Sequence, residues 1–118
     1  MLLKRAMLFV KDFPAMARFY GDVLGLNPIA ETRTDTWIEF ETGFALHAIP
    51  PHIAEGIEIL SPPQPRENHP IKLAFAVDDL TSECERLESL GVKILQTPWG
   101  TCDAVDPEGN ILQLCPAQ

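Results

Sequence analysis

Apolar residues recur along this chain with two alternating periods. Residues 4–10 have the two-residue period of a strand, with alanine, leucine and valine on one face and mixed residues on the other. Residues 13–24 change to helical spacing, and Asp12 is placed to cap that helix. Residues 36–40 and 44–49 return to the two-residue period. The first half is therefore predicted to form a strand, a helix and then further strands.

The second half of the chain repeats this plan. Residues 71–77 alternate like the first strand, and Asp78 or Asp79 is expected to cap the helix that follows. Gly43 and Gly109, which each precede an alternating run, lie 66 positions apart. The chain is therefore predicted to contain an internal duplication. Further strands are expected at residues 92–97, 101–105 and 111–115.

A turn sequence and a proline-rich segment separate these elements. Residues 106–110 combine proline, glycine and asparagine in the manner of a hairpin turn, in which Gly109 is predicted to take a positive φ. Six of the eleven prolines lie between residues 50 and 70, which cannot be a regular helix or a central strand and are expected to form an ordered crossover. The predicted organisation is a first module at residues 1–49, a linker at 50–70 and a second module at 71–118, together one domain at 1–118.

The order of these elements, and two short motifs, resemble a known superfamily. The segment FYGDVLGL at residues 19–26 is similar to the first helix of that superfamily and its exit, and PWG at residues 98–100 is similar to the approach to its last hairpin. With the tandem plan, the Pro-rich join and the closing turn, the chain resembles the vicinal oxygen chelate superfamily of glyoxalases, bleomycin-resistance proteins and extradiol dioxygenases. The resemblance implies an α+β fold of two tandem βαβββ modules, whose curled sheets surround a concave cup with one helix outside each.

The face of each sheet that lines this cup can be assigned from the pattern. If the helix covers the more apolar face, the opposite face is unusually polar for a cup interior. Buried polar groups need a partner or a ligand, because burial without one costs several kcal/mol. The side chains assigned to the cup are Arg5, Met7, Phe9, Trp37, Glu39, His47, Lys72, Ala74, Ala76, Asp103 and Gln113.

The resemblance also implies where a metal would be held. In glyoxalase-like members, a divalent metal is bound by the first and last strands of each module. The corresponding positions here are Arg5, His47, Lys72 and Gln113. Arginine and protonated lysine lack the lone pair that a metal requires, and two cations would repel it. We therefore expect no metal and no other cofactor, unless Glu39, Asp103 or a shifted strand register supplies ligands.

Two interpretations of Arg5 and Lys72 stay open. In the first, they form internal ion pairs with Glu39 and Asp103, which hold the barrel together in place of a metal. In the second, they bind an anionic or carbonyl-bearing ligand, and the arginine grips a carboxylate through two donors. The two roles can coexist, because a ligand carboxylate can compete for the same cations.

Other cup residues have a binding and a packing interpretation. Trp37 and Trp99 could stack on a flat ligand or pack in the core. His47 could contact a ligand or be a hydrogen-bonded core histidine. Ala74 and Ala76 leave volume that larger side chains would fill. The predicted substrate-binding set is Arg5, Trp37, His47, Lys72, Trp99 and Gln113, and the catalytic candidates are His47, Glu39 and Asp103.

Charge and cysteine content narrow the function classes. A net charge of −8, a pI near 4.7 and the lack of a Lys/Arg run argue against nucleic acid or an anionic membrane as partner. The early apolar run at residues 6–10 is too short for a signal peptide or a membrane span, so we expect a cytoplasmic protein. Three widely spaced cysteines indicate neither a disulfide framework nor a zinc knuckle, and they are expected to be buried thiols.

Three hypotheses of function follow, from different classes. The first is a metal-free module that binds a small organic molecule in the cup. The second is a lyase, isomerase or epimerase in which Glu39, Asp103 or His47 moves a proton and a cation stabilises an enolate. The third, a metal-dependent glyoxalase or dioxygenase, is disfavoured by the ligand positions. We also expect a homodimer, because curled sheets leave strand edges and apolar rims that pairing would cover.

Overall fold

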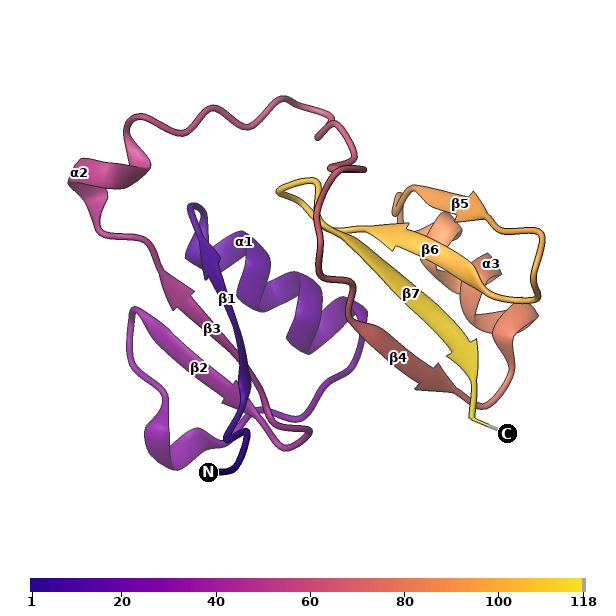
Figure 1. Ribbon diagram of the computed structural model, residues 1–118, viewed down its shortest axis with the longest axis horizontal. Helices are drawn as coiled ribbons and strands as arrows, with labels where there is room; N and C mark the ends of the chain where they lie inside the picture. The colour runs from indigo at the N-terminus through magenta and orange to yellow at the C-terminus, as the bar shows by residue number, and fades with distance from the viewer. Residues whose placement is uncertain (118) are drawn as a thin grey trace. The chain divides into compact units, whose positions relative to one another are not determined.

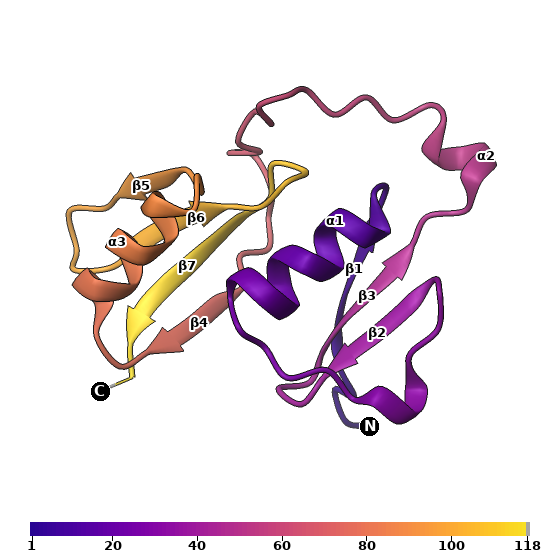
Figure 2. The same ribbon diagram turned by 180° about the vertical axis from the view of Figure 1, so that it is seen from behind.

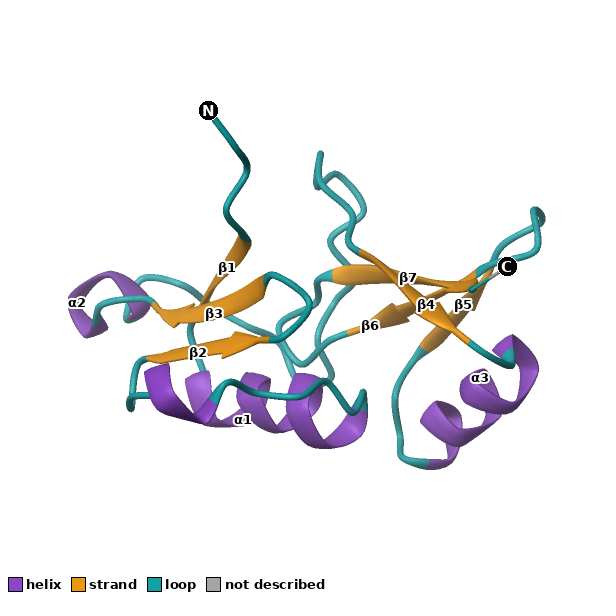
Figure 3. Cartoon of the chain, turned by 90° about the horizontal axis from the view of Figure 1, so that it is seen from below, coloured by secondary structure: helices purple, strands orange, loops and turns teal. Residues whose placement is uncertain are grey.

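The computed structural model describes residues 1–117, which fold as two compact units (Figure 1). Unit 1 covers Met1–Glu58 and unit 2 begins at Ile59, so the division falls inside the Pro-rich segment. Each unit has a sheet with one helix packed on one face, as the views in Figures 2 and 3 both show. No helix within the described residues is long and apolar enough to cross a membrane.

Unit 1 is built on a three-stranded mixed sheet. Its strands are β1 (Ala6–Val10), β2 (Trp37–Phe40) and β3 (Phe44–Ala48), in the spatial order β1-β3-β2. The middle strand β3 runs parallel to β1 and antiparallel to β2. Helix α1 (Phe13–Arg18) continues without a break into one π-helical turn, η1 (Phe19–Val23).

The core of unit 1 lies between α1 and its sheet. Ile38, Phe40 and Leu46 from the sheet, and Met16 and Tyr20 from the helical segment, are each at most 1% exposed. The alternation in the sequence explains this, because every second strand residue points to the helix. The predicted cap is also present, since the Asp12 carboxylate accepts a hydrogen bond of 3.1 Å from the Ala15 backbone.

The first module differs from a full βαβββ unit in its second strand. Between η1 and β2 the chain forms a 3₁₀ turn, η2 (Ala30–Thr32), and a single bridge from Pro28 to Phe40. Two backbone hydrogen bonds flank this bridge, from the Ile29 N–H to the Glu39 carbonyl at 2.8 Å and from the Glu41 N–H to the Asn27 carbonyl at 3.0 Å. Pro28 therefore stands at a position whose N–H group the ladder does not use.

Unit 2 has a four-stranded sheet. Its strands are β4 (Ala74–Val77), β5 (Ile94–Gln96), β6 (Cys102–Val105) and β7 (Ile111–Pro116), in the order β4-β7-β6-β5. Helix α3 (Leu80–Ser89) covers one face, and of the two candidate caps it is Asp79 that accepts a 3.0 Å bond from the Ser82 backbone. The predicted α+β fold class, with tandem modules and curled sheets, is confirmed.

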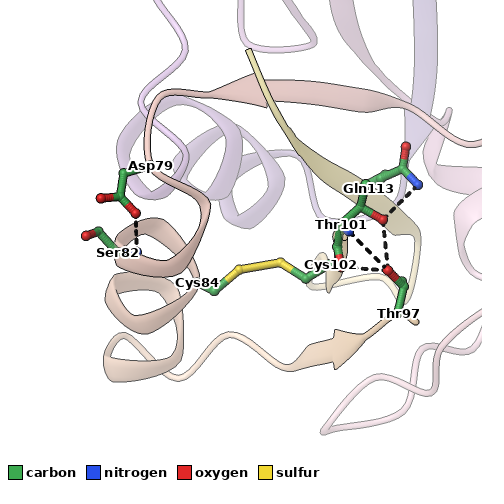
Figure 4. The surroundings of a disulfide bond; sticks show 7 residues. All are labelled: Asp79, Ser82, Cys84, Thr97, Thr101, Cys102 and Gln113. Atoms are coloured by element: carbon green, nitrogen blue, oxygen red, sulfur yellow. Dashed lines mark hydrogen bonds between the residues drawn. A yellow bond between two sulfur atoms is a disulfide. The ribbon is translucent and has the colours of Figure 1, made fainter. Parts of the chain in front are cut away.

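The expectation for the cysteines was wrong for two of the three. Cys84 on α3 and Cys102 on β6 form a disulfide that joins the helix to its sheet, and both residues are buried (Figure 4). Cys115 remains a free thiol. A separation of 18 positions gives no local signal for pairing, and only the packing of α3 on the sheet brings the two sulfur atoms together.

The Pro-rich segment is ordered by one short helix and by contacts to the closing turn. Helix α2 (Pro51–Ala54) begins with a proline at its first position, where a missing N–H group does no harm. Farther along, the Arg66 backbone donates to the Gly109 carbonyl at 2.8 Å, and its Nε donates to the Glu108 carbonyl at 3.1 Å. The predicted positive φ of Gly109 is confirmed at +90°.

Candidate functional site

The face of the unit 1 sheet opposite α1 carries a compact group of polar and aromatic side chains. Phe9, His47 and Trp37 lie side by side on three neighbouring strands, because β3 pairs Phe9 with His47 on one side and His47 with Trp37 on the other. Glu39 follows two residues after Trp37 on the same face, and Arg5 precedes β1. We call Arg5, Phe9, Trp37, Glu39 and His47 the unit 1 cluster.

Three interactions hold Arg5, Trp37 and Glu39 together. The Arg5 guanidinium lies 3.6 Å from Glu39 Oε2 and its Cζ lies 5.3 Å from the centre of the Trp37 ring. The indole Nε1 of Trp37 donates to Glu39 Oε1 at 3.2 Å. The predicted ion pair between Arg5 and Glu39 is therefore confirmed, and a cation–π contact accompanies it.

His47 lies between two aromatic rings. Its ring is 5.2 Å from that of Phe9 and 5.7 Å from that of Trp37, both in edge-on geometry. Phe9 is 53% exposed and Met7, its neighbour on the same face, is 45% exposed. The open face of unit 1 thus presents aromatic surface that the unit does not bury, which is typical of a binding surface.

A pocket of about 640 Å³ also reaches His47. It lies at the ends of β1 and β3 and is lined mainly by apolar residues of α1, of α2 and of the segment between β3 and α2, among them Phe13, Ile49 and Pro51. Lys11 is at its wall, where its ammonium group donates to the Ile57 carbonyl. A volume of this size falls within the usual range of small-molecule pockets, about 300–1,000 Å³.

Unit 2 brings together the remaining predicted polar residues. Lys72 Nζ donates to Asp103 Oδ2 at 2.9 Å, which confirms the second predicted ion pair. Asp103 on β6 lies directly opposite Gln113 on β7, which in turn pairs with Ala74 on β4. Asp103 is 8% exposed, whereas the Lys72 side chain is 43% exposed.

A smaller pocket of about 210 Å³ adjoins this ion pair. Lys72 and Asp103 form part of its wall, and Ile71, Leu95 and Ile111 contribute apolar surface. Arg66, Glu67 and His69, from the end of the Pro-rich segment, complete the lining.

Within unit 2, Trp99 does not line the pocket that contains Lys72 and Asp103. Trp99 lies in the turn between β5 and β6, is 67% exposed, and makes no ring contact within residues 1–117. Sequence reasoning missed Thr97 and Thr101, whose hydroxyl groups lie next to Gln113 (Figure 4). Threonine is common in strands, so no sequence signal distinguished these two.

The donor set at the four expected metal positions does not fit a divalent ion. Arg5 and Lys72 are engaged as cations in ion pairs, and the Gln113 amide donates from Nε2 to Thr101 Oγ1 at 3.3 Å. Only His47 offers a lone pair that binds metals well. Within the described part of the chain, no group of three or more His, Cys, Asp or Glu residues is placed to hold a metal ion.

Comparison with known proteins identifies the family. The model of the Glyoxalase/Bleomycin resistance protein/Dioxygenase superfamily matches residues 2–114. The chain belongs to this superfamily. The resemblance seen in its motifs is therefore confirmed, although membership alone assigns no chemistry, because the scaffold hosts several. A search of curated proteins found no match.

Several solved structures share the fold over nearly the whole chain. A protein of unknown function from Agrobacterium tumefaciens is 25% identical with a TM-score of 0.74, and the match covers 100% of this chain and 95% of that one. TnmS3, an antibiotic binding protein from Streptomyces, is 22% identical with a TM-score of 0.60, covering 97% and 95%. A trypanothione-dependent glyoxalase I from Leishmania major is 16% identical with a TM-score of 0.67, covering 98% and 86%.

Proposed function

We propose that this chain binds a small, flat organic molecule with a carboxylate or carbonyl group on the open face of unit 1, without a metal. The observation that carries the proposal is the position of His47, whose ring belongs to the aromatic row of the unit 1 cluster while the residue lines the 640 Å³ pocket. His47 therefore joins the apolar pocket to the aromatic row, in which Trp37 carries the Arg5 cation.

The unit 1 cluster supplies the polar recognition. The distance from the Arg5 guanidinium to Glu39 Oε2 is 3.6 Å, which is longer than a charge-assisted hydrogen bond of about 2.7–2.9 Å. A ligand carboxylate can therefore approach the guanidinium with better geometry than Glu39 has. Trp37, which lies under Arg5, keeps the guanidinium over the open face while this exchange occurs.

The aromatic row and the pocket supply the apolar recognition. Exposed Phe9 gains contacts when a flat ring covers it, because burial of apolar surface is worth about 25 cal/mol per Å². The pocket beside His47 is lined by prolines and by residues at the ends of regular elements. Such a lining is largely preformed, which lowers the entropy cost of binding. TnmS3, with the same fold, is an antibiotic binding protein, so the scaffold is compatible with binding of organic molecules.

The test is a titration with planar aromatic carboxylates and α-oxo acids, namely benzoate, 1-naphthoate and phenylpyruvate, followed by calorimetry and Trp37 fluorescence. A Trp99→Phe background leaves Trp37 as the one fluorescent indole, since the chain has two tryptophans. Arg5→Gln should weaken binding about tenfold or more, the loss expected for one charge-assisted contact. Arg33→Gln, at an exposed arginine of the same unit, is the matched control.

Two outcomes would contradict the proposal. One is that no compound of the panel binds, and the other is that Arg33→Gln weakens binding as much as Arg5→Gln does. Any compound that binds is then incubated with the protein and analysed for turnover, with Glu39→Gln and His47→Gln as variants. Turnover that either variant abolishes would replace simple binding by the lyase or isomerase hypothesis.

A further inference from the structure

The pocket of unit 2 contains a carboxylate that lacks a hydrogen bond. Asp103 Oδ2 is paired with Lys72, but Oδ1 is buried and has no partner within the described residues. A buried acceptor without a donor destabilises the fold, because it has lost its hydrogen bonds to water. Because Asp103 lines the 210 Å³ pocket, a donor that enters there can remove this deficit.

The side-chain donor directly across the ladder is turned away from Asp103. Gln113 faces Asp103 in the register of β6 and β7, yet its Nε2 donates to Thr101 Oγ1 at 3.3 Å (Figure 4). The orientation of this amide is decided by the two threonine hydroxyl groups.

Each threonine hydroxyl group has one proton to donate, and this determines which group is the donor in each of the hydrogen bonds between Thr97, Thr101 and Gln113. Thr97 Oγ1 donates its single proton to the Thr101 carbonyl at 2.6 Å. In the 2.9 Å bond between the two hydroxyl groups, Thr101 must therefore be the donor. With its proton used, Thr101 Oγ1 can only accept from Gln113, so it selects the NH₂ end of the amide.

Gln113 consequently turns its carbonyl oxygen away from Thr101. No partner of Oε1 is found among residues 1–117, and Oε1 is not among the buried unpaired atoms. This face of unit 2 therefore offers acceptors from Asp103 and Gln113, and N–H donors from the half-exposed Lys72. The small side chain of Ala74, opposite Gln113, leaves the face uncovered.

We propose that unit 2 contains a second binding site, specific for a small molecule with a primary carboxamide group. The amide N–H groups donate to Asp103 and to Gln113 Oε1, and the amide carbonyl accepts from Lys72. The apolar body of the ligand contacts Ile71, Leu95 and Ile111, which line the pocket together with Asp103 and Lys72. Gln113 lies next to this lining, across the ladder from Asp103. At about 30 Å³ per water, the pocket volume equals roughly seven waters, enough for one ring with its amide.

The chemistry of the face disfavours the charged analogues. Lys72 or Arg66 can receive one oxygen of a carboxylate, but its other oxygen would lie against the acceptors of Asp103 and Gln113, and an ammonium group would lie beside the Lys72 cation. A neutral amide has one acceptor and two donors on the same group, which complements this arrangement without an unpaired charge. Thr97 and Thr101 are positioning residues here, because they act on the ligand through Gln113.

The binding test uses three compounds with the same ring: benzamide, N,N-dimethylbenzamide and benzoate. Chemical-shift mapping on the ¹⁵N-labelled full chain reports which unit each compound touches. Benzamide should shift the amide signals of Asp103 and Gln113, including the Gln113 side-chain NH₂. N,N-dimethylbenzamide, which has no N–H donor, should bind at least tenfold more weakly, because the buried Asp103 Oδ1 would stay unpaired. Benzoate should not shift these signals of unit 2, even if it binds beside Trp37 in unit 1. Because the two units have separate signals, failure of the carboxamide site can be distinguished from failure of the proposed function.

Variants of the threonine chain test the positioning role. Thr101→Val keeps the shape of the side chain but frees the Gln113 amide, and should reduce the preference for benzamide over N,N-dimethylbenzamide to less than threefold. Thr101→Ser retains the hydroxyl group and should restore the preference. Thr81→Val, at an exposed position on α3, is the control and should change nothing. Melting temperatures of all variants verify that the chain is folded.

The proposal is overturned if benzamide causes no shifts in unit 2. It is also overturned if benzamide and N,N-dimethylbenzamide bind there equally well. A Thr101→Ser variant that loses the preference while it remains folded would remove the role assigned to the hydroxyl group, and with it the orientation of Gln113 on which the specificity depends.

Discussion

At the scale of single residues, Gly109 is where the closing turn meets the Pro-rich segment. Its φ is +90°, and a Cβ atom added there would lie 2.3 Å from the Gln64 carbonyl oxygen. Gly109→Ala should therefore be destabilising through both backbone strain and a clash with backbone, by roughly 2 kcal/mol or more. For a chain of this size, the melting temperature should fall by about 5–10 °C.

The control for this prediction separates strain from the clash. Gly25 has nearly the same φ, +82°, but nothing lies within 4 Å of an added Cβ. Gly25→Ala should thus cost only the strain, about 1 kcal/mol. Equal losses for the two variants would show that the contact with Gln64 has no energetic effect, and an unchanged melting temperature for Gly109→Ala would refute the strain as well.

Sequence reasoning predicted the residue pairs well where strand alternation determines them. Arg5 with Glu39, and Lys72 with Asp103, could be paired because the face of each side chain follows from the two-residue period. The direction of the hydrogen bonds that run from Thr97 through Thr101 to Gln113 could not be predicted, since it depends on side-chain rotamers and on which acceptor receives the single proton of each hydroxyl group. The exposure of Trp99 could not be predicted either, because the pattern does not determine where a turn points its side chains.

At the scale of the elements, the start of α3 depends on one of two adjacent aspartates. Asp79 accepts the Ser82 backbone N–H at 3.0 Å, whereas Asp78 is exposed and makes no hydrogen bond within the described chain. Asp79→Ala should lower the free energy of unfolding by about 1 kcal/mol, the usual value for a lost N-cap. Asp78→Ala is the matched control and should be near neutral in a urea titration. A larger effect at Asp78 would mean that the cap is misassigned.

The predicted elements agree with the structure where the period is long and regular. The five apolar-alternating segments that became β1, β2, β3, β4 and β7 were all found, because each has a face that packs towards a helix. The second strand of the first module is reduced to the bridge at Pro28, because the chain enters η2 directly after it. The disulfide between Cys84 and Cys102 joins two elements whose packing no local pattern encodes.

At the scale of the whole molecule, the two units share a plan but differ in chemistry. Unit 1 presents aromatic rings around one arginine, and unit 2 presents acceptors around one lysine. A net charge of −8 disfavours anionic ligands at long range, so a carboxylate must be recognised by the local cation. Added salt should therefore raise the association rate of anionic ligands, because it screens the net negative charge, and should weaken the final ion pair with the local cation.

The homodimer expected from the sequence stays a prediction, and the edges of the sheets support it. β1 and β4 are edge strands, and β1 carries the exposed side chains of Met7 and Phe9. Such edges are usually covered in soluble proteins. Sedimentation at micromolar concentration should give a dimer, and Met7→Lys should shift it towards monomer. A clean monomer of the unsubstituted chain would contradict this expectation.

The last prediction concerns metal, because it separates the binding hypothesis from metal-dependent chemistry in this superfamily. Of the four expected ligand positions, Arg5 and Lys72 hold cations in ion pairs. A third, Gln113, holds an amide whose NH₂ group donates a hydrogen bond to a hydroxyl group. Purified protein should contain well under one equivalent of zinc, nickel, iron or manganese. Added divalent ions should not raise its melting temperature, since a ligand that binds only the folded state at 100 times its Kd would contribute about 2.7 kcal/mol.

His47 is the position at which this prediction can fail. If one equivalent of metal co-purifies, is lost with His47→Ala and is retained with His52→Ala at an exposed histidine, then His47 is a ligand. Arg5 and Lys72 would then have to leave their ion pairs, or Glu39 and Asp103 would have to leave those pairs to coordinate the ion. Either rearrangement would break the contacts from which the metal-free site of unit 1 and the carboxamide site of unit 2 were inferred, so both proposals depend on the protein being free of metal.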